Sequence, residues 1–340
     1  MIWAILIVVL AMLVTMVAIR RGFYHNSLMR LFFALVLCGL LPLLLQVAVS
    51  FFWGDVAGWV VAGLWLSLVL YGFIFGWRHI VVRTAECRSP LLPAAFDGYR
   101  VLQLADLHIG TFLRNPAFVR KLVRMVNDQQ ADLIVFTGDL VNVSANEVIP
   151  FQHDLAQMHA RDGIFSVMGN HDYCEYGMDG NPGRNQRILE YMEEKMSWRL
   201  LMNEHVLIHR PDGAGGSSAI ALIGVENISK PPFPEYGNLP KAMEGLPRGL
   251  FKILLSHDPS HWRRGVLGVT DIALTLSGHT HAGQIKIGHF SPAKWAYNEW
   301  GGKYVEGDSM LYVSLGLGGT MPFRFGAWPE INVITLRRKT

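Results

Sequence analysis

The sequence predicts a large α/β domain preceded by three helices that cross a membrane. Half of the 340 residues are hydrophobic (51%), and the long uncharged stretches all lie before Arg78. Beyond residue 98, short runs of apolar and β-branched residues alternate with amphipathic segments. This alternation is typical of parallel strands joined by crossover helices.

Three stretches near the N-terminus contain no Asp, Glu, Lys or Arg, at residues 2–19, 31–53 and 56–77. Each reaches the roughly 18 to 20 apolar residues needed to cross a bilayer core. Buried core helices are the alternative, but three such stretches in succession fit a soluble fold poorly. A cleaved signal peptide is disfavoured, because no basic residue precedes the first stretch and no small-residue cleavage pattern follows it. We therefore expect a transmembrane region over residues 1–80.

The basic residues around these spans indicate their orientation. Arg20, Arg21 and Arg30 lie between the first and second spans, only Asp55 lies between the second and third, and arginines return after the third. Short cytoplasmic loops carry an excess of Lys and Arg. The pattern predicts a multi-pass protein of the inner or plasma membrane, with its N-terminus outside and everything after Arg78 in the cytoplasm.

The remainder divides into a linker and one domain. Residues 81–98, which include Pro90 and Pro93, are interpreted as a linker, and residues 99–340 are long enough for a single large domain. Basic and acidic residues are nearly balanced, at 30 Lys plus Arg against 27 Asp plus Glu. No nucleic-acid partner is expected, since such proteins usually carry a concentrated basic surface.

Periodicity predicts the elements of this domain in order. In its first half, β-branched runs predict strands at 99–104, 133–136 and 164–168, and amphipathic stretches predict helices at 116–127, 149–158 and 185–196. The second half is richer in predicted strands, at 206–209, 219–224, 251–256, 272–277, 284–287, 310–315 and 331–336. Residues 230–247 contain five prolines and are a candidate lid or substrate loop, because the stretch is too long for a simple turn.

Polar motifs follow five of the predicted strands. They read D-L-H at 106–108, G-D at 138–139, G-N-H-D at 169–172, S-H-D at 256–258 and G-H-T-H at 278–281. Taken singly most are weak, since Gly-Asp is common in turns and a lone histidine is more often structural. His279 and His281 are stronger, because side chains two apart in extended chain share a face. Five motifs at the carboxyl ends of strands predict one shared site.

The residue types suit a pair of divalent cations. Two such ions about 3.5 to 4 Å apart repel each other and need a shared anionic ligand. A single carboxylate can bridge them, and neutral imidazoles complete each coordination shell without excess negative charge that would repel a phosphate. A mixed Asp, Asn and His set favours Mn, Fe, Co or Zn over Ca, without choosing among them.

The ordered motifs resemble those of the calcineurin-like metallophosphoesterase superfamily, over residues 106–281. The leading spans and the tail segments at 300–302, 306–308, 324–326 and 329–331 look like bacterial membrane-anchored members, including some similar to a UDP-2,3-diacylglucosamine pyrophosphatase. The resemblance implies a metallophosphoesterase β-sandwich flanked by helices. It also implies hydrolysis of a phosphodiester or pyrophosphate bond, with a metal-activated hydroxide attacking phosphorus.

The resemblance assigns roles residue by residue. The first metal takes Asp106, His108 and His281, the bridge is Asp139, and the second metal takes Asn170, His257 and His279. His171 would act as general acid toward the leaving oxygen, with Asp172 holding its ring. Asp172 stands where the serine/threonine phosphatases of the superfamily usually have Glu, which disfavours a protein phosphatase.

Two further sets of residues have open roles. Arg114 and Arg324 could bind a phosphoryl group, or could be structural or solvated. Several aromatic rings in the tail suit a membrane boundary, although ordinary core packing explains each equally well. These rings are Phe290, Trp295, Tyr297, Trp300 and Tyr304.

The expected partners are a lipid bilayer and a phosphoester substrate that is lipid-linked or nucleotide-linked. The site cannot lie far from the bilayer, because few residues separate the third span from Asp106. One alternative is a tethered phosphodiesterase for soluble nucleotides or cyclic nucleotides, which is disfavoured only because three spans exceed what a tether needs. Another is a non-catalytic membrane scaffold that binds metal, which has no need of the His171 and Asp172 pair.

Overall fold

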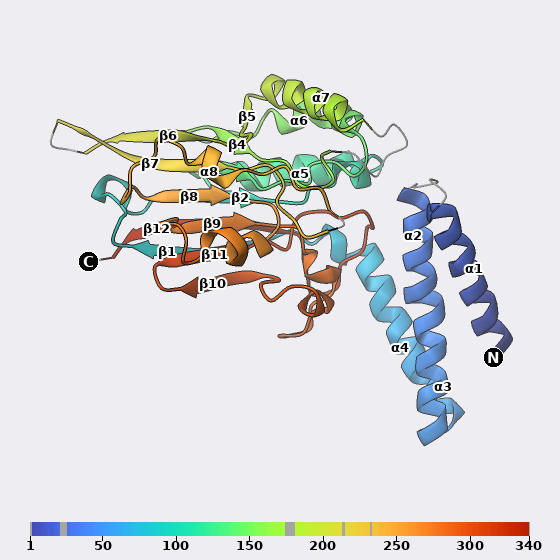
Figure 1. The fold of residues 1–340 in the computed structure, drawn as a ribbon. Helices are drawn as coiled ribbons and strands as arrows, with labels where there is room; N and C mark the ends of the chain where they lie inside the picture. Colours follow the sequence, from blue (N-terminus) through green and yellow to red (C-terminus); the bar gives the residue numbers. More distant parts are fainter. Residues whose placement is uncertain (1, 21–25, 174–180, 213–214, 232, 340) are drawn as a thin grey trace.

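The computed structural model describes residues 2–20, 26–173, 181–212, 215–231 and 233–339. Apolar helices at the N-terminus stand beside a larger α/β body (Figure 1). Helix α1 is followed by one long helical stretch that contains α2, a π-helical segment and α3, and then by α4 and a short 3₁₀ turn. Their bounds are α1 Ile2–Arg20, α2 Asn26–Ala34, the π-helical Leu35–Leu40, α3 Leu41–Trp53, α4 Asp55–Ile74 and the 3₁₀ turn Gly76–Arg78. Gly54 joins α3 to α4 with a φ of 84°, a value that favours glycine.

Two of these helices, Ser27–Trp53 and Asp55–Arg78, are long and apolar enough to cross a membrane. The third apolar helix, Ile2–Ala18, is shorter. At about 1.5 Å per residue it spans less than the roughly 30 Å of a hydrocarbon core. Of the three expected spans, two correspond to helices of the described chain that are long enough to cross a membrane. The first expected span is too short. Arg21, used in the orientation argument, lies outside the described residues.

In the part of the chain that the structure describes, the α/β body contains two six-stranded sheets. In the order in which the strands pair, the first sheet consists of β1 Val81–Ser89, β12 Glu330–Arg338, β2 Arg100–Leu104, β3 Leu133–Phe136, β4 Ile164–Ser166 and β5 Trp198–Leu200. The second consists of β10 Gly302–Glu306, β11 Ser309–Val313, β9 Leu274–Ser277, β8 Lys252–Leu255, β7 Ser217–Gly224 and β6 Glu204–Pro211. Strands β2 to β5 pair in parallel, as the alternation of strands and helices predicted.

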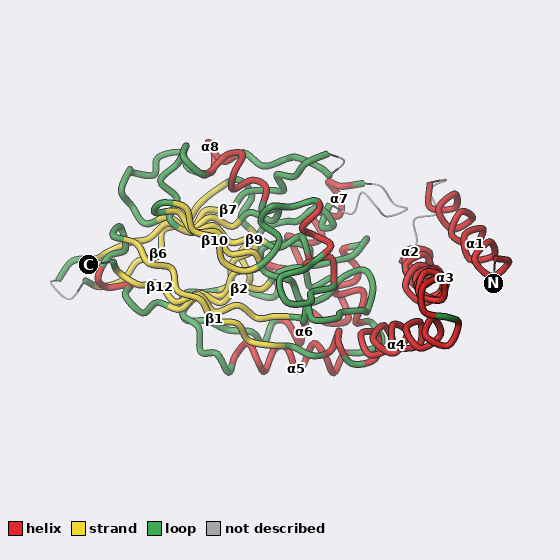
Figure 2. Tube along the Cα trace, turned by 90° about the horizontal axis from the view of Figure 1, so that it is seen from below, coloured by secondary structure: helices red, strands yellow, loops and turns green. Residues whose placement is uncertain are grey.

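Alternating side chains divide the body into layers. Val101 and Val135 of the first sheet face Leu222 and Ile253 of the second in the core between the sheets. The outer face of the first sheet packs against α5 (Pro116–Asn127), α6 (Gln152–Leu155) and α7 (Pro182–Lys195), and that of the second against the short α8 (Leu239–Ala242). Figure 2 shows α5 and α8 on opposite sides of the strands. This mixed α/β arrangement agrees with the expected sandwich flanked by helices.

The structure corrects the predicted linker at 81–98. Val81–Ser89 forms the edge strand β1, which pairs in parallel with β12 from Val81 opposite Glu330 to Ser89 opposite Arg338. Cys87 and Leu92 are buried in the core between the sheets. The two prolines suggested an open linker, but the partner of β1 lies about 250 residues away in sequence, so local patterns could not reveal the pairing.

Two other predicted elements differ. The expected helix at 149–158 is mostly the 3₁₀ segment Ala145–Phe151, followed by the short α6, because Pro150 has no N–H to donate within a regular α-helix. The expected strand at 284–287 is reduced to two isolated bridges, one between Ile285 and Phe325 and one between Ile287 and Phe290. The short strands β5 and β10 were not predicted.

Helix α4 docks on the segment around Arg324. The backbone N–H of Arg324 donates to the carbonyl of Gly72 at 3.3 Å, and Phe323 packs with Leu37 and Val69 of the helices. A Cβ atom at Gly76 would collide with the carbonyl oxygen of Arg324, so only glycine allows this close approach. The end of α4 therefore contacts the segment around Arg324. That segment also lies beside the strand ends that carry the polar motifs.

Candidate metal centre

The five polar motifs meet at one edge of the two sheets. They follow β2, β3 and β4 of the first sheet and β8 and β9 of the second. Strands β8 and β9 point toward the side of the body where α2 and α4 lie (Figure 1). The carboxyl ends of parallel strands gather functional groups in this way. The structure thus brings the predicted site residues together at the end of the domain next to the membrane helices.

A first cluster consists of Asp106, His108, Asp139 and His281, with one potential ligand atom of each within 4.8 Å of the others. The Nε2 atoms of His108 and His281 lie 3.3 Å apart. Asp106 Oδ1 is 3.5 Å from His281 Nε2, and Asp139 Oδ2 is 3.5 Å from His108 Nε2. Two imidazole nitrogens and two carboxylates therefore point to one position.

A second cluster shares Asp139 with the first and adds His257 and His279. His257 Nε2 is 3.2 Å from both Asp139 Oδ2 and His279 Nδ1. The other oxygen of Asp139, Oδ1, accepts the backbone N–H of His171 at 2.8 Å. Asp139 Oδ2 consequently lies between the two clusters. Asn170 is buried and lines, together with residues of both clusters, a cavity of about 390 Å³.

These donor sets fit divalent metal ions. Two imidazole ligands at about 2.1 Å from one ion have nitrogens about 3.0 to 3.4 Å apart, which matches both pairs. Burial lowers the pKa of His108 to about 3 and that of His279 to about 4, and it holds the pKa of His281 well below its usual value. These imidazoles are therefore neutral near pH 7, the state in which nitrogen can bind a metal.

The backbone of the site is unusual. Asp106, His108, Asp139, His279 and His281 have φ between 46° and 72°, in the left-handed region that non-glycine residues rarely adopt. Such strain persists where surrounding structure enforces it, and it is concentrated at functional sites. Here the backbone N–H of His279 donates to both oxygens of Asp106, at 2.9 and 3.0 Å, which ties the end of β9 to the end of β2.

Three of the clustered imidazoles are also held from outside the clusters, through the ring nitrogen that faces away from them. His257 Nδ1 is 2.8 Å from the carbonyl of Thr137, and His279 Nε2 is 2.7 Å from the Tyr297 hydroxyl. Arg324 Nη2 lies 3.3 Å from His281 Nδ1. Such contacts fix ring orientation at metal sites. Tyr297, considered from sequence as a membrane-boundary ring, instead belongs to this site, and no local pattern distinguishes it from its aromatic neighbours.

Asp172 binds backbone groups of the neighbouring loops, and its predicted role of holding the His171 ring stays a prediction. Its oxygens accept the backbone N–H groups of Asp139, Leu140, Val141 and Gly169 at 2.7 to 3.1 Å. The ring of His171 has its Nδ1 atom 2.7 Å from the carbonyl of Asn142. Through its four backbone N–H donors, Asp172 stabilises the loops that carry Asp139 and Asn170.

The two arginines considered for phosphate binding differ. Arg324 is 1% exposed, and its guanidinium donates to the carbonyls of Leu315, Ala327 and Gly318. These contacts favour the structural role for Arg324, with one edge against His281. Arg114 is exposed, and its role stays a prediction.

A cavity of about 390 Å³ opens onto the clusters. Its walls combine His108, Asp139, Asn170, His171, His279 and His281 with Phe233 and with Pro292, Ala293, Ala296 and Tyr297. Phe233 packs edge-on against His279, with ring centroids 5.0 Å apart. The predicted lid or substrate loop at 230–247 therefore contributes a side chain to the site, although Pro232 lies outside the described residues.

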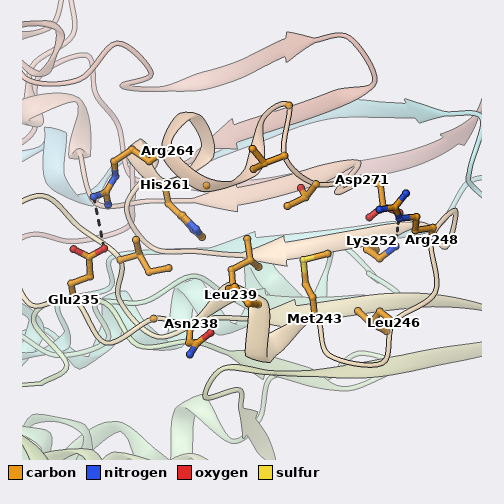
Figure 3. A pocket seen from close by; sticks show the side chains of 17 residues that line it. Glu235, Asn238, Leu239, Met243, Leu246, Arg248, Lys252, His261, Arg264 and Asp271 are labelled. Carbon is orange, nitrogen blue, oxygen red and sulfur yellow. Dashed lines mark hydrogen bonds and ion pairs between the residues drawn. The ribbon is translucent and has the colours of Figure 1, made fainter.

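The rest of that loop borders a separate, larger cavity of about 1100 Å³ beside α8 (Figure 3). Four of the charged side chains there form two ion pairs: Lys252 Nζ lies 2.8 Å from Asp271 Oδ2, and Arg264 Nη1 lies 3.8 Å from Glu235 Oε1. None of the clustered histidine and aspartate ligands lines this cavity.

Comparisons with known proteins agree with this geometry. The model of the calcineurin-like phosphoesterase family matches residues 99–283. An uncharacterized metallophosphoesterase of Bacillus subtilis, YkuE, is 30% identical over 78% of this chain and 90% of its own length. A bovine protein named transmembrane protein with metallophosphoesterase domain is 32% identical over 79% of this chain and 60% of its own length.

A third relative carries a named substrate. LpxG of Chlamydia trachomatis, a UDP-2,3-diacylglucosamine pyrophosphatase, is 27% identical over 70% of this chain and 83% of its own length. The family match covers the strands and loops that carry both clusters. The chain therefore belongs to the calcineurin-like phosphoesterase family and is a hydrolase of phosphoric esters.

Proposed function

We propose that this protein is a membrane-anchored, two-metal phosphoesterase that cleaves a phosphodiester or pyrophosphate bond of a lipid-linked substrate. The observation that carries the proposal is the position of Asp139 Oδ2 between two pairs of imidazole nitrogens. In this site one ion is held by Asp106, His108 and His281, the other by Asn170, His257 and His279, and both by Asp139. Two such ions neutralise phosphoryl oxygens and lower the pKa of a bound water.

His171 is the proposed general acid. It lines the cavity, and its ring lies edge-on to that of His108 with centroids 4.8 Å apart. Because Nδ1 is engaged by the carbonyl of Asn142, we assign Nε2 as the atom that delivers a proton to the leaving oxygen. The carbonyl fixes the ring without supplying a second charge near the phosphate.

The anchoring part of the proposal rests on the helices. Ser27–Trp53 and Asp55–Arg78 have the length and composition of membrane spans, and α1 is treated as a third, shorter membrane helix. The bovine relative, which is named as a transmembrane protein, supports this interpretation. Arg30 and Arg78 lie at the ends of their helices that adjoin the α/β body, so the rule for basic residues assigns the body to the cytoplasm.

The lipid-linked substrate is inferred from one wall of the cavity. Pro292, Ala293, Ala296 and Tyr297 line the cavity, while nearby Ile287, Phe290 and Trp295 are 57%, 46% and 80% exposed. The same segment begins at Ile285, which packs against the helix cluster of Leu37 and Val69. An exposed aromatic wall that starts at the membrane helices suits contact with acyl chains.

The decisive experiment compares an acylated nucleotide-linked lipid precursor with its deacylated analogue, using the full chain in liposomes. We expect kcat/KM to be much higher for the acylated substrate, since acyl contacts can contribute to transition-state binding. Equal cleavage of both would favour a tethered phosphodiesterase for soluble nucleotides. Absence of cleavage after Mn, Fe, Zn or Co has been supplied in turn would favour the metal-binding scaffold.

A further inference from the structure

A chain of hydrogen bonds connects membrane helix α2 to the proposed general acid. It starts at Arg30, a charged residue in an otherwise apolar helical stretch. Its Nε donates to the carbonyl of Thr320 at 2.8 Å and its Nη2 to Thr111 Oγ1 at 3.2 Å. Both acceptors belong to loops of the α/β body, so the guanidinium joins the helix to the catalytic domain.

Thr111 uses its full hydrogen-bonding capacity. Its hydroxyl donates to the carbonyl of Gly319 at 2.6 Å and accepts from both Arg30 and Asn142 Nδ2, the latter at 3.1 Å. A hydroxyl has one proton to donate and two lone pairs that accept. All three are engaged here, and the position of Thr111 is therefore tightly specified.

Asn142 completes the connection. It is fully buried, its side chain donates to Thr111, and its carbonyl is the group that holds His171 Nδ1 at 2.7 Å. Its backbone N–H donates to Glu147 Oε2 at 2.6 Å. Burial raises the pKa of Glu147, and the positive charge of Arg30 opposes that shift. Arg30 is thus coupled to both sides of the residue that orients His171.

We propose that Arg30 is a positioning residue for phosphoester hydrolysis: through Thr111 and Asn142 it holds His171 in the orientation that protonates the leaving oxygen. The inference rests on the general-acid role proposed above for His171. It makes the membrane helix pair part of the catalytic unit, in addition to being an anchor. A charge placed within a span is costly unless partnered, and partnership with the domain gives it a function.

The test uses the full chain in nanodiscs and a series of aryl phosphodiesters whose phenol leaving groups differ in acidity. Poor leaving groups need a proton most, so loss of a positioned general acid slows them selectively. We expect Arg30→Gln to lower kcat for the poorest leaving group on the order of 10-fold, within the range that misplacement of a reacting group can cost. The rate of release of nitrophenol, an acidic phenol that leaves readily without a proton, should change little. KM and metal content should also change little.

Three further variants support this test. Thr111→Val removes the hydroxyl with little change in volume and should reproduce the selective defect. Arg30→Lys, which keeps one donor, should recover part of the rate. Arg78→Gln removes an equivalent charge from the 3₁₀ turn that follows α4 and should behave as wild type, because Arg78 is exposed and stacks on Trp77.

A double-mutant cycle separates the inference from the proposed function. In a His171→Ala background, Arg30→Gln should cause no further loss. If the two defects instead multiply, or if Arg30→Gln slows all leaving groups equally, Arg30 does not act through His171 and the inference is overturned. If His171→Ala itself lacks selectivity for poor leaving groups, the proposed role of His171 fails first.

Discussion

At the scale of single residues, Asp139 is the group on which both clusters depend. Its Oδ2 lies 3.5 Å from His108 Nε2 and 3.2 Å from His257 Nε2, and its Oδ1 accepts the N–H of His171. Its φ of 59° is a strained value for aspartate. The surrounding loops maintain that conformation because Asp172 binds the N–H groups of Asp139 and its two successors.

Asp139→Asn should therefore lose metal and activity together, since an amide cannot supply the shared negative charge. His171→Ala should retain metal and lose rate by roughly 10² to 10⁴, the range for a lost general acid. Elemental analysis of the purified variants, combined with turnover measurements, checks both expectations. Equal loss of metal from the two variants would assign His171 to a coordination shell.

Glu193 of α7 gives a pH prediction outside the metal centre. Burial raises its pKa from 4.5 to about 8, with Ser166 donating to its carboxylate. The folded state thus keeps a proton that the unfolded state releases, so the free energy of unfolding falls as pH rises from about 4.5 to about 8. Glu193→Gln should abolish this pH dependence of the free energy of unfolding, because glutamine does not ionise.

Thermal unfolding of the wild type and of Glu193→Gln at a series of pH values measures the effect. The two proteins should unfold alike below about pH 4.5. Between that pH and about pH 8, the stability of the variant should progressively exceed that of the wild type. Above that pH the difference should stay constant. A difference that does not vary with pH would mean that Glu193 is ionised in the folded protein.

The positions of the polar motifs could be read from the sequence because each follows a recognisable apolar strand. The sequence could not predict which groups from other loops hold the site side chains by hydrogen bonds. The contact of Tyr297 with His279 and that of Asn142 with His171 join residues from different loops, and Asp172 binds backbone groups that carry no sequence signal. The convergence of the ligand residues is observed, and their individual roles stay predictions.

At the scale of elements, the segment 285–297 connects the site to the membrane helices. Its inner side lines the cavity and its outer side carries Phe290 and Trp295, whose rings meet edge-on with centroids 5.8 Å apart. Lys286 and Lys294 in the same segment suit the anionic headgroups of a cytoplasmic leaflet. Under the proposed function, a segment with these two sides would pass an acylated substrate from the bilayer to the cavity.

Trp295→Ser should reduce kcat/KM for a liposome-embedded acylated substrate on the order of 10-fold, because the loss of a large apolar contact with lipid weakens binding by a few kcal/mol at most. The deacylated substrate in solution should be cleaved as before. Tyr191→Ser on α7 is the matched control, since Tyr191 is 58% exposed and does not line the cavity. Equal losses on both substrates would mean that Trp295 supports the cavity wall rather than lipid contact.

The elements that the sequence predicted well are those whose signal is local. The predicted bounds of α5 and β3 coincide with those in the structure, because Pro116 occupies the first turn of an amphipathic helix and β3 is a short buried run. Strand β1 was taken for a linker, since its partner β12 comes from the other end of the chain. Local patterns reveal an amphipathic helix, because its apolar face repeats within the helix itself. They miss an edge strand whose hydrogen-bond partner lies far away in the sequence.

At the scale of the whole molecule, the metal centre, the docking contacts of α4 and the start of α2 lie at one end of the α/β body (Figure 1). The family resemblance predicted the sandwich, and apolar stretches predicted the helices. Neither could predict that the helices contact the loops of the site. That arrangement places the metal centre at the end of the domain that adjoins the apolar helices. Under the proposed function, the orientation of the helix pair then decides which compartment supplies the substrate.

The orientation can be measured with single cysteines in a background without the native ones. Asp55→Cys lies at the turn between α3 and α4, far from the body, and Ser217→Cys lies at an exposed position on β7. With the basic residues on the cytoplasmic side, an impermeant thiol reagent should label Asp55→Cys in intact cells and should leave Ser217→Cys unmodified. Both should react after lysis, which controls for accessibility. Because two antiparallel spans put Asp55 and the body on opposite sides, the reverse pattern would assign the metal centre to the outer face. The substrate would then be an extracytoplasmic phosphoester, and the proposed cytoplasmic lipid precursor would be excluded.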